Sequence, residues 1–150
     1  MTAPNYIRYR GQIYRQAAAT PSAGLVTNIE QTTTDNRNYR RVLYTGKYSQ
    51  LVVMCLQPGE EIGEEVHKHT DQFFRIEAGQ GEVVINGNHQ QVKAESAAVV
   101  PAGSKHNVIN TGQKVLQLYT IYSPPHHRDG IVVATKADEV EEHFDGRTTE

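Results

Sequence analysis

The chain has 150 residues and a formal net charge of −2 at neutral pH, which fits a single domain of ordinary size. A near-neutral balance argues against nucleic-acid binding, because phosphate contacts require a strong excess of Lys and Arg. The longest apolar runs, such as Leu51 to Leu56, are far short of the ~20 residues that a membrane span needs. The N-terminus also lacks the apolar stretch of a signal peptide. We therefore expect partners other than nucleic acid or membrane.

The composition favours a sheet protein in a reducing compartment. Val and Ile number 15 and 9 against 6 Leu, and 13 Thr add to this β-branched excess, which suits pleated sheets. Cys55 stands alone, so no disulfide can form within the chain. We expect an all-β, cytoplasmic protein.

The N-terminal region, residues 1–40, differs in charge and pattern from the rest. Residues 1–41 carry six Arg against two acidic groups, whereas residues 42–150 carry nine basic and fifteen acidic groups. No sustained periodicity appears in the first ~25 residues, so we expect a partly ordered extension or a strand that docks on a partner subunit. Anion or RNA binding by its Arg and Tyr residues is the alternative.

Strand signals recur every eight to twelve residues from residue 41, as in a sandwich or barrel. The expected strands are 41–45, 50–57, 65–69, 72–77, 82–86, 89–93, 97–100, 105–110 and 115–122. Asn86-Gly87 predicts a type I′ hairpin turn, which needs positive φ at both central residues. A short helix is expected from Lys136 to His143. The predicted organisation is an extension at 1–40, a barrel at 41–123, and a loop with a short helix at 124–150.

Three histidines are spaced like metal ligands. His67 and His69 are two apart on an expected strand, so both imidazoles leave one face. Gln72 shares a face with Phe74 and Ile76 on the next strand, and His106 opens a later one.

These residues resemble the cupin superfamily, whose motifs are G-x5-H-x-H-x3-4-E-x6-G and G-x5-P-x-G-x2-H-x3-N. The first is matched by Gly59, His67-Lys68-His69 and Gln72 through Gly79, and the second by Pro101 through Asn110. The resemblance implies a jelly-roll β-barrel that binds one divalent transition-metal ion (Zn, Fe, Mn, Ni or Cu) through His67, His69, Gln72 and His106.

The match has three departures. Glu95 replaces the first glycine of the second motif, the gap from Gly59 to His67 is two residues too long, and Gln72 stands in place of the ligand glutamate, too close to His69. A neutral Gln72 leaves the ion's charge uncompensated, which weakens binding but strengthens the Lewis acid. Gln72 is either a direct ligand or a contact beside the ion or substrate. Without it, three histidines form an open site of the kind zinc enzymes use.

Other candidate residues have plainer interpretations. The remaining histidines, His89, His126, His127 and His143, read as surface or turn residues, and Cys55 reads as a small core residue. Phe74 and Ile76 line the core or an apolar pocket wall. Tyr119 is a further pocket candidate, although the sequence does not settle which face of 115–122 meets the cavity. The loop at 124–130 is a candidate pocket lid.

The resemblance is strongest to small single-domain cupins similar to mannose-6-phosphate isomerase, which implies a metal-dependent isomerase acting on a small, sugar-like molecule. No catalytic base is evident in the motifs, so the catalytic residues are left unassigned. A cupin dioxygenase with a redox metal is the first alternative. A non-catalytic module that binds a metal or small ligand is the second. A homodimer is the expected oligomer.

Overall fold

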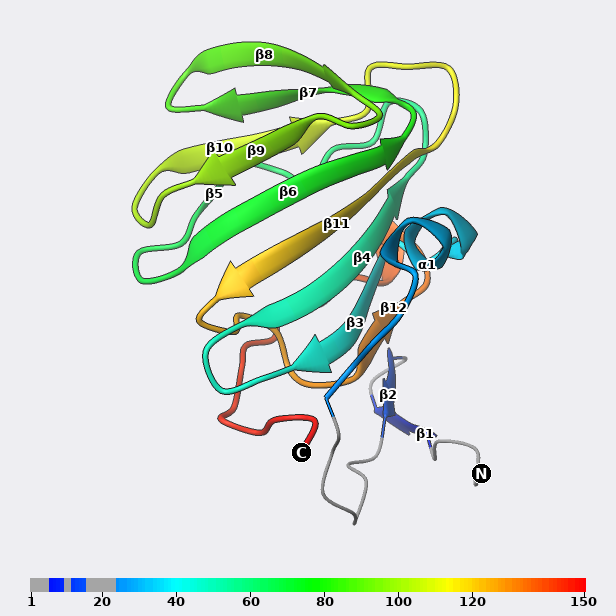
Figure 1. Cartoon of the computed structure of the whole chain (residues 1–150), viewed down its shortest axis with the longest axis vertical. Helices are drawn as coiled ribbons and strands as arrows, with labels where there is room; N and C mark the ends of the chain where they lie inside the picture. The colour runs from blue at the N-terminus through cyan, green and yellow to red at the C-terminus, as the bar shows by residue number, and fades with distance from the viewer. Residues whose placement is uncertain (1–5, 10–11, 16–23) are drawn as a thin grey trace.

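The computed structural model describes residues 6–9, 12–15 and 24–150, which form two facing antiparallel sheets (Figure 1). The larger sheet has the strand order β1-β2-β12-β3-β4-β11-β6-β9, and the smaller has β5-β10-β7-β8. The strands are β1 (Tyr6–Tyr9), β2 (Gln12–Arg15), β3 (Arg40–Thr45), β4 (Gln50–Leu56), β5 (Glu65–Val66), β6 (Asp71–Ala78), β7 (Gln80–Ile85), β8 (Asn88–Lys93), β9 (Ala97–Val100), β10 (Lys105–Ile109), β11 (Leu116–Ser123) and β12 (Ile131–Val133). The expected all-β jelly roll is confirmed.

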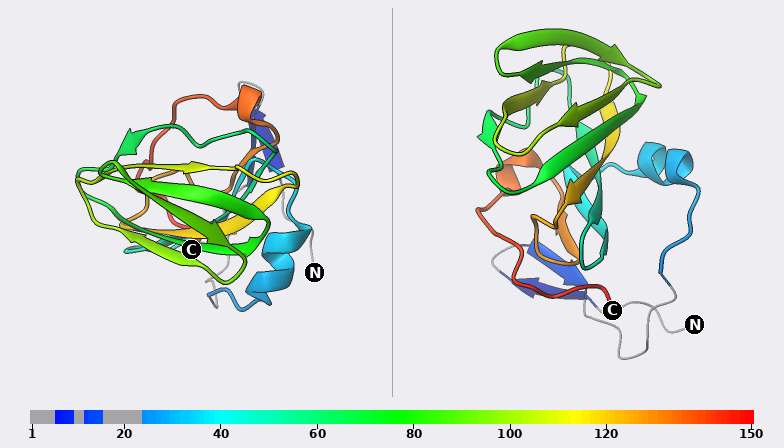
Figure 2. Two further views of the ribbon diagram at one scale, coloured as in Figure 1. Left: turned by 90° about the horizontal axis from the view of Figure 1, so that it is seen from above. Right: turned by 60° about the vertical axis from the view of Figure 1, so that its left-hand side comes forward.

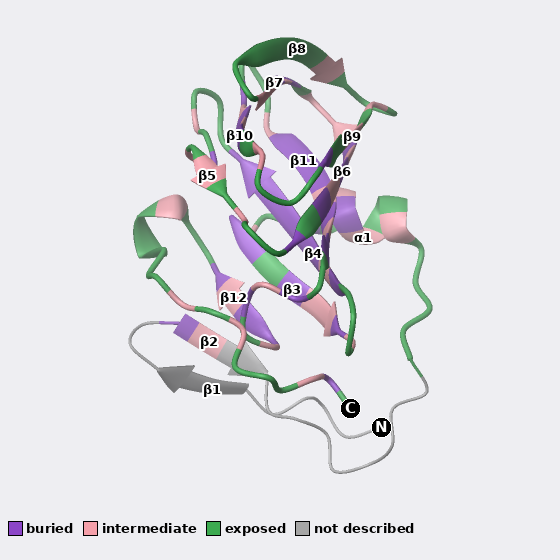
Figure 3. Ribbon diagram, turned by 90° about the vertical axis from the view of Figure 1, so that its left-hand side faces the viewer, coloured by how far each residue is buried: buried purple, intermediate pink, exposed green. Residues whose placement is uncertain are grey.

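The core lies between the two sheets, where buried strand faces meet (Figure 3). Alternation along β6 buries Gln72, Phe74 and Ile76 on one face, as predicted from the sequence. Along β11 the buried face carries Leu116, Leu118, Thr120 and Tyr122. Burying each large apolar side chain contributes ~1.5–3 kcal/mol. The polar Gln72 and Thr120 within this face mark where the core gives way to a polar site.

The hairpin predicted at Asn86-Gly87 is present. Ile85 and Asn88 pair across the turn that joins β7 and β8, and Asn86 and Gly87 have φ values of 48° and 81°. These are the left-handed conformations that a type I′ turn requires.

The N-terminal region has more structure than we expected. Helix α1 (Ile29–Asp35) begins at Asn28, whose side chain accepts a hydrogen bond from the Gln31 backbone N–H. It lies against the outer face of the larger sheet (Figure 2), where the Gln117 side chain donates to the backbone carbonyls of Thr34 and Asn36. Because α1 has almost no apolar stripe, periodicity could not reveal it.

The extreme N-terminal segment falls partly outside the described residues, namely at 1–5, 10–11 and 16–23. Its described strand β2 pairs with β12 of the same chain. The strand exchange with a partner subunit, and the homodimer, stay predictions that light scattering would test. Among the described residues, no helix is long and apolar enough to cross a membrane.

The C-terminal helix expected from Lys136 to His143 is wrong. Only a 3-10 turn, η1 (Lys136–Asp138), forms there. The residues that follow are irregular, because their carboxylates bind partners elsewhere in the chain: Glu139 pairs with Arg40 of β3, and Glu142 with His127 of the loop after β11. These tertiary contacts have overridden a favourable local helix propensity. The C-terminal segment and α1 lie on opposite sides of the larger sheet (Figure 2).

Candidate metal centre

Glu65, His67 and His106 form a cluster between the two sheets. Glu65 of β5 pairs directly with His106 of β10, so the two side chains leave the same face of the smaller sheet. His67 follows Glu65 by two residues and returns to that face. The carboxylate and imidazole ligand atoms of these three residues all lie within 4.8 Å of one another. The cluster is therefore compact enough for one cation.

His67 presents an unused nitrogen to this cluster. Its Nε2 is buried and has no hydrogen-bond partner in the part of the chain that the structure describes, although Glu65 Oε2 lies 3.2 Å away. Burial opposes ionisation of Glu65, but the neighbouring His67, Arg40 and His106 outweigh it and hold the pKa of Glu65 below its ordinary value. A charged carboxylate thus faces an unsatisfied imidazole nitrogen, as ligands of one ion do.

Gln72 joins the cluster from β6 of the opposite sheet. Its Nε2 donates to Thr120 Oγ1 at 3.0 Å, which orients its Oε1 toward His106 Nε2 at 3.1 Å. The other ring nitrogen of His106, Nδ1, lies 3.0 Å from the backbone carbonyl of Ser104. Burial lowers the pKa of His106, so the neutral ring has one proton for two acceptors. With the Gln72 amide in this orientation, one of the two His106 contacts brings two lone pairs together in either tautomer.

A metal ion resolves this conflict. If Nδ1–H donates to Ser104, the free lone pair of His106 Nε2 and that of Gln72 Oε1 both point toward one position. Their 3.1 Å separation is what two adjacent ligands at ~2.1 Å from an ion would show. The Ser104 carbonyl is then the outer partner that fixes the ring. Glu65, His67, Gln72 and His106 fit a divalent transition metal.

The structure differs from the sequence interpretation at His69. The chain turns at Lys68 and His69 instead of continuing the strand, and His69 is exposed outside the cluster. Glu65 occupies the position expected of a second histidine. The motif spacing carried this signal: with Glu65 and His67 as the paired ligands, the gaps from Gly59 and to Gln72 both match the pattern. Two of the three departures came from reading the motif two residues too late.

The predicted pocket residues divide between the two faces of the larger sheet. Phe74 and Ile76 are buried in the core, and the Phe74 ring centre lies 6.2 Å from that of His106. Tyr119 is a correction, because it lies on the outer face of β11. There it packs beside Phe73 and lines a shallow apolar hollow near α1. Cys55 is buried, as expected.

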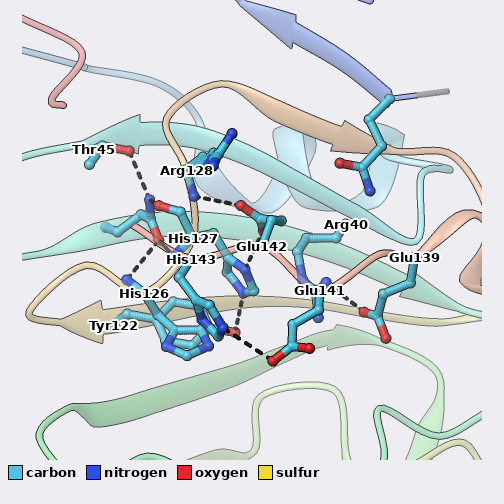
Figure 4. Close-up of polar contacts among 12 residues, drawn as sticks. Arg40, Thr45, Tyr122, His126, His127, Arg128, Glu139, Glu141, Glu142 and His143 are labelled. Carbon is cyan, nitrogen blue, oxygen red and sulfur yellow. Dashed lines mark hydrogen bonds and ion pairs between the residues drawn. The ribbon is translucent and has the colours of Figure 1, made fainter. Parts of the chain in front are cut away.

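Two further histidines reach the cluster from the segment after β11. The ring centre of His126 lies 4.2 Å from that of His67. The His126 ring also stacks on Tyr122 (Figure 4). Four histidines were expected to be surface or turn residues. His89 and His143 are exposed, as expected, but His126 is half-buried and His127 is buried. The loop at 124–130 therefore packs against the cluster, where a lid would lie. It has no periodicity, so its histidines gave no signal beyond their residue type.

A buried hydrogen-bond chain starts beside the cluster. Tyr122 Oη lies 3.2 Å from His127 Nε2, and His127 Nδ1 lies 2.9 Å from Glu142 Oε1. Glu142 also accepts from the Arg128 backbone N–H (Figure 4). Burial raises the pKa of Tyr122 and of Glu142, and it holds that of His127 well below the ordinary value. The chain therefore joins a neutral phenol to a neutral imidazole and a carboxyl group.

Comparisons with known proteins agree with this fold. A cupin-domain family model matches residues 52–122. The uncharacterized protein YrkC of Bacillus subtilis is 48% identical over 121 residues, which cover 77% of this chain but only 65% of that protein. A mannose-1-phosphate guanylyltransferase of Salmonella montevideo is 30% identical over 78 residues, which are 52% of this chain and 17% of the enzyme.

Among solved structures, BH2720 from Bacillus halodurans superposes with a TM-score of 0.76 at 43% identity. The match covers 82% of this chain and 97% of that one. The cupin-domain match and the superposed structure both agree with the barrel described above, and the chain belongs to the cupin family.

Proposed function

We propose that this protein is a metal-dependent enzyme that acts on a small oxygenated organic molecule. One divalent transition ion would be held by Glu65, His67, Gln72 and His106. The observation that carries the proposal is the convergence of ligand-type atoms: a buried His67 Nε2 that has no hydrogen bond among the described residues and lies 3.2 Å from Glu65 Oε2, and a His106 ring whose two nitrogens each face an acceptor oxygen. Leaving such groups unpaired in a protein interior is costly.

When bound, the ion would supply Lewis-acid chemistry, polarising a carbonyl or hydroxyl oxygen of the substrate. The chain's own residues do the rest. Glu65 contributes the one carboxylate among the ligands, so a divalent ion keeps a net charge of about +1. The Phe74 ring forms an apolar wall of the site beside His106. These features favour a polar reacting group held at the cluster.

Proton transfer has a candidate route through Tyr122. With the His127 proton on Nδ1, this nitrogen donates to Glu142 and the Tyr122 hydroxyl donates to His127 Nε2. General acid-base steps need such a positioned group. This arrangement is our candidate for the proton-transfer group that the motifs lacked, and it favours isomerase-like chemistry. The sugar-phosphate chemistry named for the Salmonella relative is compatible with that proposal.

A second candidate function is O2-dependent oxidation. Two histidines and one carboxylate, with open positions beside them, are the donor set of many non-haem Fe(II) oxygenases. Glu65, His67 and His106 provide that set. A site with Glu65 in place of His69 therefore favours an oxygenase more than a site of three histidines would.

Metal analysis of freshly purified protein, followed by assays with restored ions, tests the proposal. We expect about one transition ion per chain in the wild type, and none in a His67→Ala, His106→Ala double variant. Isomerisation of small sugars with no oxygen uptake supports the first function, and iron-dependent uptake supports the second. Metal binding without turnover of any substrate would leave a binding module. Unchanged metal content in the double variant would overturn the assignment.

A further inference from the structure

Arg40 places a guanidinium inside the barrel. It is the first residue of β3 and pairs with Met54, a core residue of β4. The Arg40 side chain is only 5% exposed to solvent. Charged side chains are almost never buried this deeply without a dedicated partner. A buried arginine in a barrel that holds a candidate metal centre therefore calls for an explanation.

Its partner comes from the exposed C-terminal segment. Arg40 Nη1 donates to Glu139 Oε2 at 2.6 Å (Figure 4). The pair is unequal, because the Glu139 side chain keeps 33% of its surface exposed and belongs to an irregular stretch after η1. Glu139 can turn to solvent at small cost, whereas Arg40 needs another anion if Glu139 leaves.

Glu139 accepts a hydrogen bond from only one of the guanidinium nitrogens of Arg40. Arg40 Nε is buried without a hydrogen-bond partner among residues 24–150. The guanidinium carbon lies 5.2 Å from the centre of the Tyr39 ring, and Lys136 Nζ lies 5.3 Å from it. Arg40 Nε is thus a buried donor that the Glu139 carboxylate does not satisfy. A planar carboxylate that engages two guanidinium nitrogens would be bound more fully.

The guanidinium also lies within electrostatic reach of the metal cluster. Its charge helps to hold the pKa of Glu65 below its ordinary value, although burial of Glu65 is the larger, opposing influence. It acts likewise on Tyr122, whose pKa burial raises. Arg40 pairs with Met54 and Met54 with Leu118, so the Arg40 side chain leaves the same face of the larger sheet as the buried Tyr122.

We propose that Arg40 is the binding site for a carboxylate group of the substrate, and that Glu139 occupies this site until the substrate displaces it. The inference rests on the proposed function for its reacting end, but it concerns a different set of residues. It adds a carboxylate group to the proposed substrate, which places that substrate among small carboxylic acids.

Acetate is the probe, with acetamide as its neutral counterpart and inorganic phosphate as a second anion. The readout is the NMR signal of the Arg40 Nε–H, assigned through bonds and titrated in chelator-treated protein. In Glu139→Gln we expect acetate to bind at least about tenfold more tightly than in the wild type, because the internal competitor has lost its charge. Acetamide should not shift the signal, and phosphate should bind more weakly than acetate.

Glu141→Gln is the matched control, since it removes the same charge from a side chain that is 90% exposed and pairs with exposed His143. It should leave acetate affinity unchanged. An equal gain in both variants, or an Arg40 signal that acetate does not move in Glu139→Gln, would overturn the proposal. Phosphate binding as tight as acetate would overturn the carboxylate class. Arg40→Lys keeps the positive charge but loses the paired N–H donors of the planar guanidinium, so it should weaken acetate binding.

The two proposals fail separately. Metal content measured in every variant reports on the cluster, whereas the Arg40 signal in metal-free protein reports on the anion site. If acetate binds only after metal is restored, it sits on the ion, and the Arg40 proposal is wrong while the metal proposal stands. If acetate binds at Arg40 but no variant ever holds metal, the reverse is true.

Discussion

Glu65 and His106 face each other across the β5–β10 pair, so a carboxylate and an imidazole leave the same point of the smaller sheet. This pairing changes the charge of the candidate metal centre. With Gln72 in the usual glutamate position, the ligands would all be neutral if histidines filled the remaining places. Glu65 restores one negative charge from a different strand. The centre therefore has the charge of an ordinary cupin site with its carboxylate relocated.

The first prediction separates Glu65 from His69. Glu65→Gln should weaken binding of a divalent transition metal by about 100-fold or more, because it removes the only charged ligand of the cluster. His69→Gln should leave the affinity within about twofold, since His69 is exposed in the turn. Metal competition titrations measure both. Equal losses in the two variants would contradict the placement of the ligands.

The second prediction concerns Gln72. Gln72→Glu places a second carboxylate beside Glu65, and we expect metal to bind about tenfold more tightly, since each added negative charge near the ion favours it. In the wild type, Thr120 Oγ1 accepts a hydrogen bond from Gln72 Nε2. After its hydroxyl rotates, Thr120 can donate a hydrogen bond to the new carboxylate. In the metal-free variant the two carboxylates repel, so its melting temperature should fall. A variant that is more stable without metal would contradict direct ligation.

The third prediction is a pH dependence of stability in metal-free protein. The folded state keeps His127 neutral, chiefly by burial, so its pKa lies well below the ordinary value. An unfolded chain binds a proton at His127 near pH 6.5, so it holds more protons than the folded chain below that pH. The free energy of unfolding should therefore fall as the pH drops from 7 to 5. For this residue the slope approaches ~1.4 kcal/mol per pH unit.

His106 and His126 act in the same direction, and burial is the largest cause for each. It lowers the pKa of His106 and, with the neighbouring His127 and His67, that of His126 to about 3. Burial raises the pKa of Glu142, so this carboxyl group binds its proton more readily in the folded chain. Near the ordinary pKa of a glutamate, Glu142 therefore opposes the loss of stability caused by the histidines. Denaturant unfolding of His127→Gln should show a smaller slope, whatever its overall stability, whereas His143→Gln removes an exposed imidazole as the control. An unchanged slope in His127→Gln would count against the buried neutral ring.

The fourth prediction tests the barrel itself through two glycines of positive φ. At Gly79, with φ +91°, a Cβ would collide with the backbone of Val115 and Leu116, so Gly79→Ala should cost ~3 kcal/mol or more. Gly87, with φ +81°, has open space around it, so Gly87→Ala should cost only the ~1–2 kcal/mol of backbone strain. Urea unfolding measures the difference, and equal costs would refute the close packing at Gly79.

Strong local patterns explain why most of the barrel was predictable. The Asn86-Gly87 turn and the alternation through Gln72, Phe74 and Ile76 depend on neighbours in sequence, and both were confirmed. Helix α1 was missed because it is short and polar. The helix expected at 136–143 was wrong because Glu139 and Glu142 bind partners elsewhere in the chain, and such contacts leave no local pattern.

The site was predictable in part for the same reason. His67, Gln72 and His106 follow from motif spacing, and Glu65 was available from that spacing too, but a histidine at His69 matched the expected residue type better. Tyr119 was misplaced because β11 carries aromatic residues on both faces. The link from Tyr122 to His127 and Glu142 depends on how an irregular segment folds back, which residue type alone does not reveal.

Anomalous X-ray diffraction from crystals of the metal-loaded protein, measured on both sides of the metal's absorption edge, tests the central claim most directly. We predict one strong difference peak about 2.0–2.3 Å from ligand atoms of Glu65, His67, Gln72 and His106, with His69 remote from it. A peak bound by His69, or no peak between the two sheets in fully loaded protein, would contradict the account.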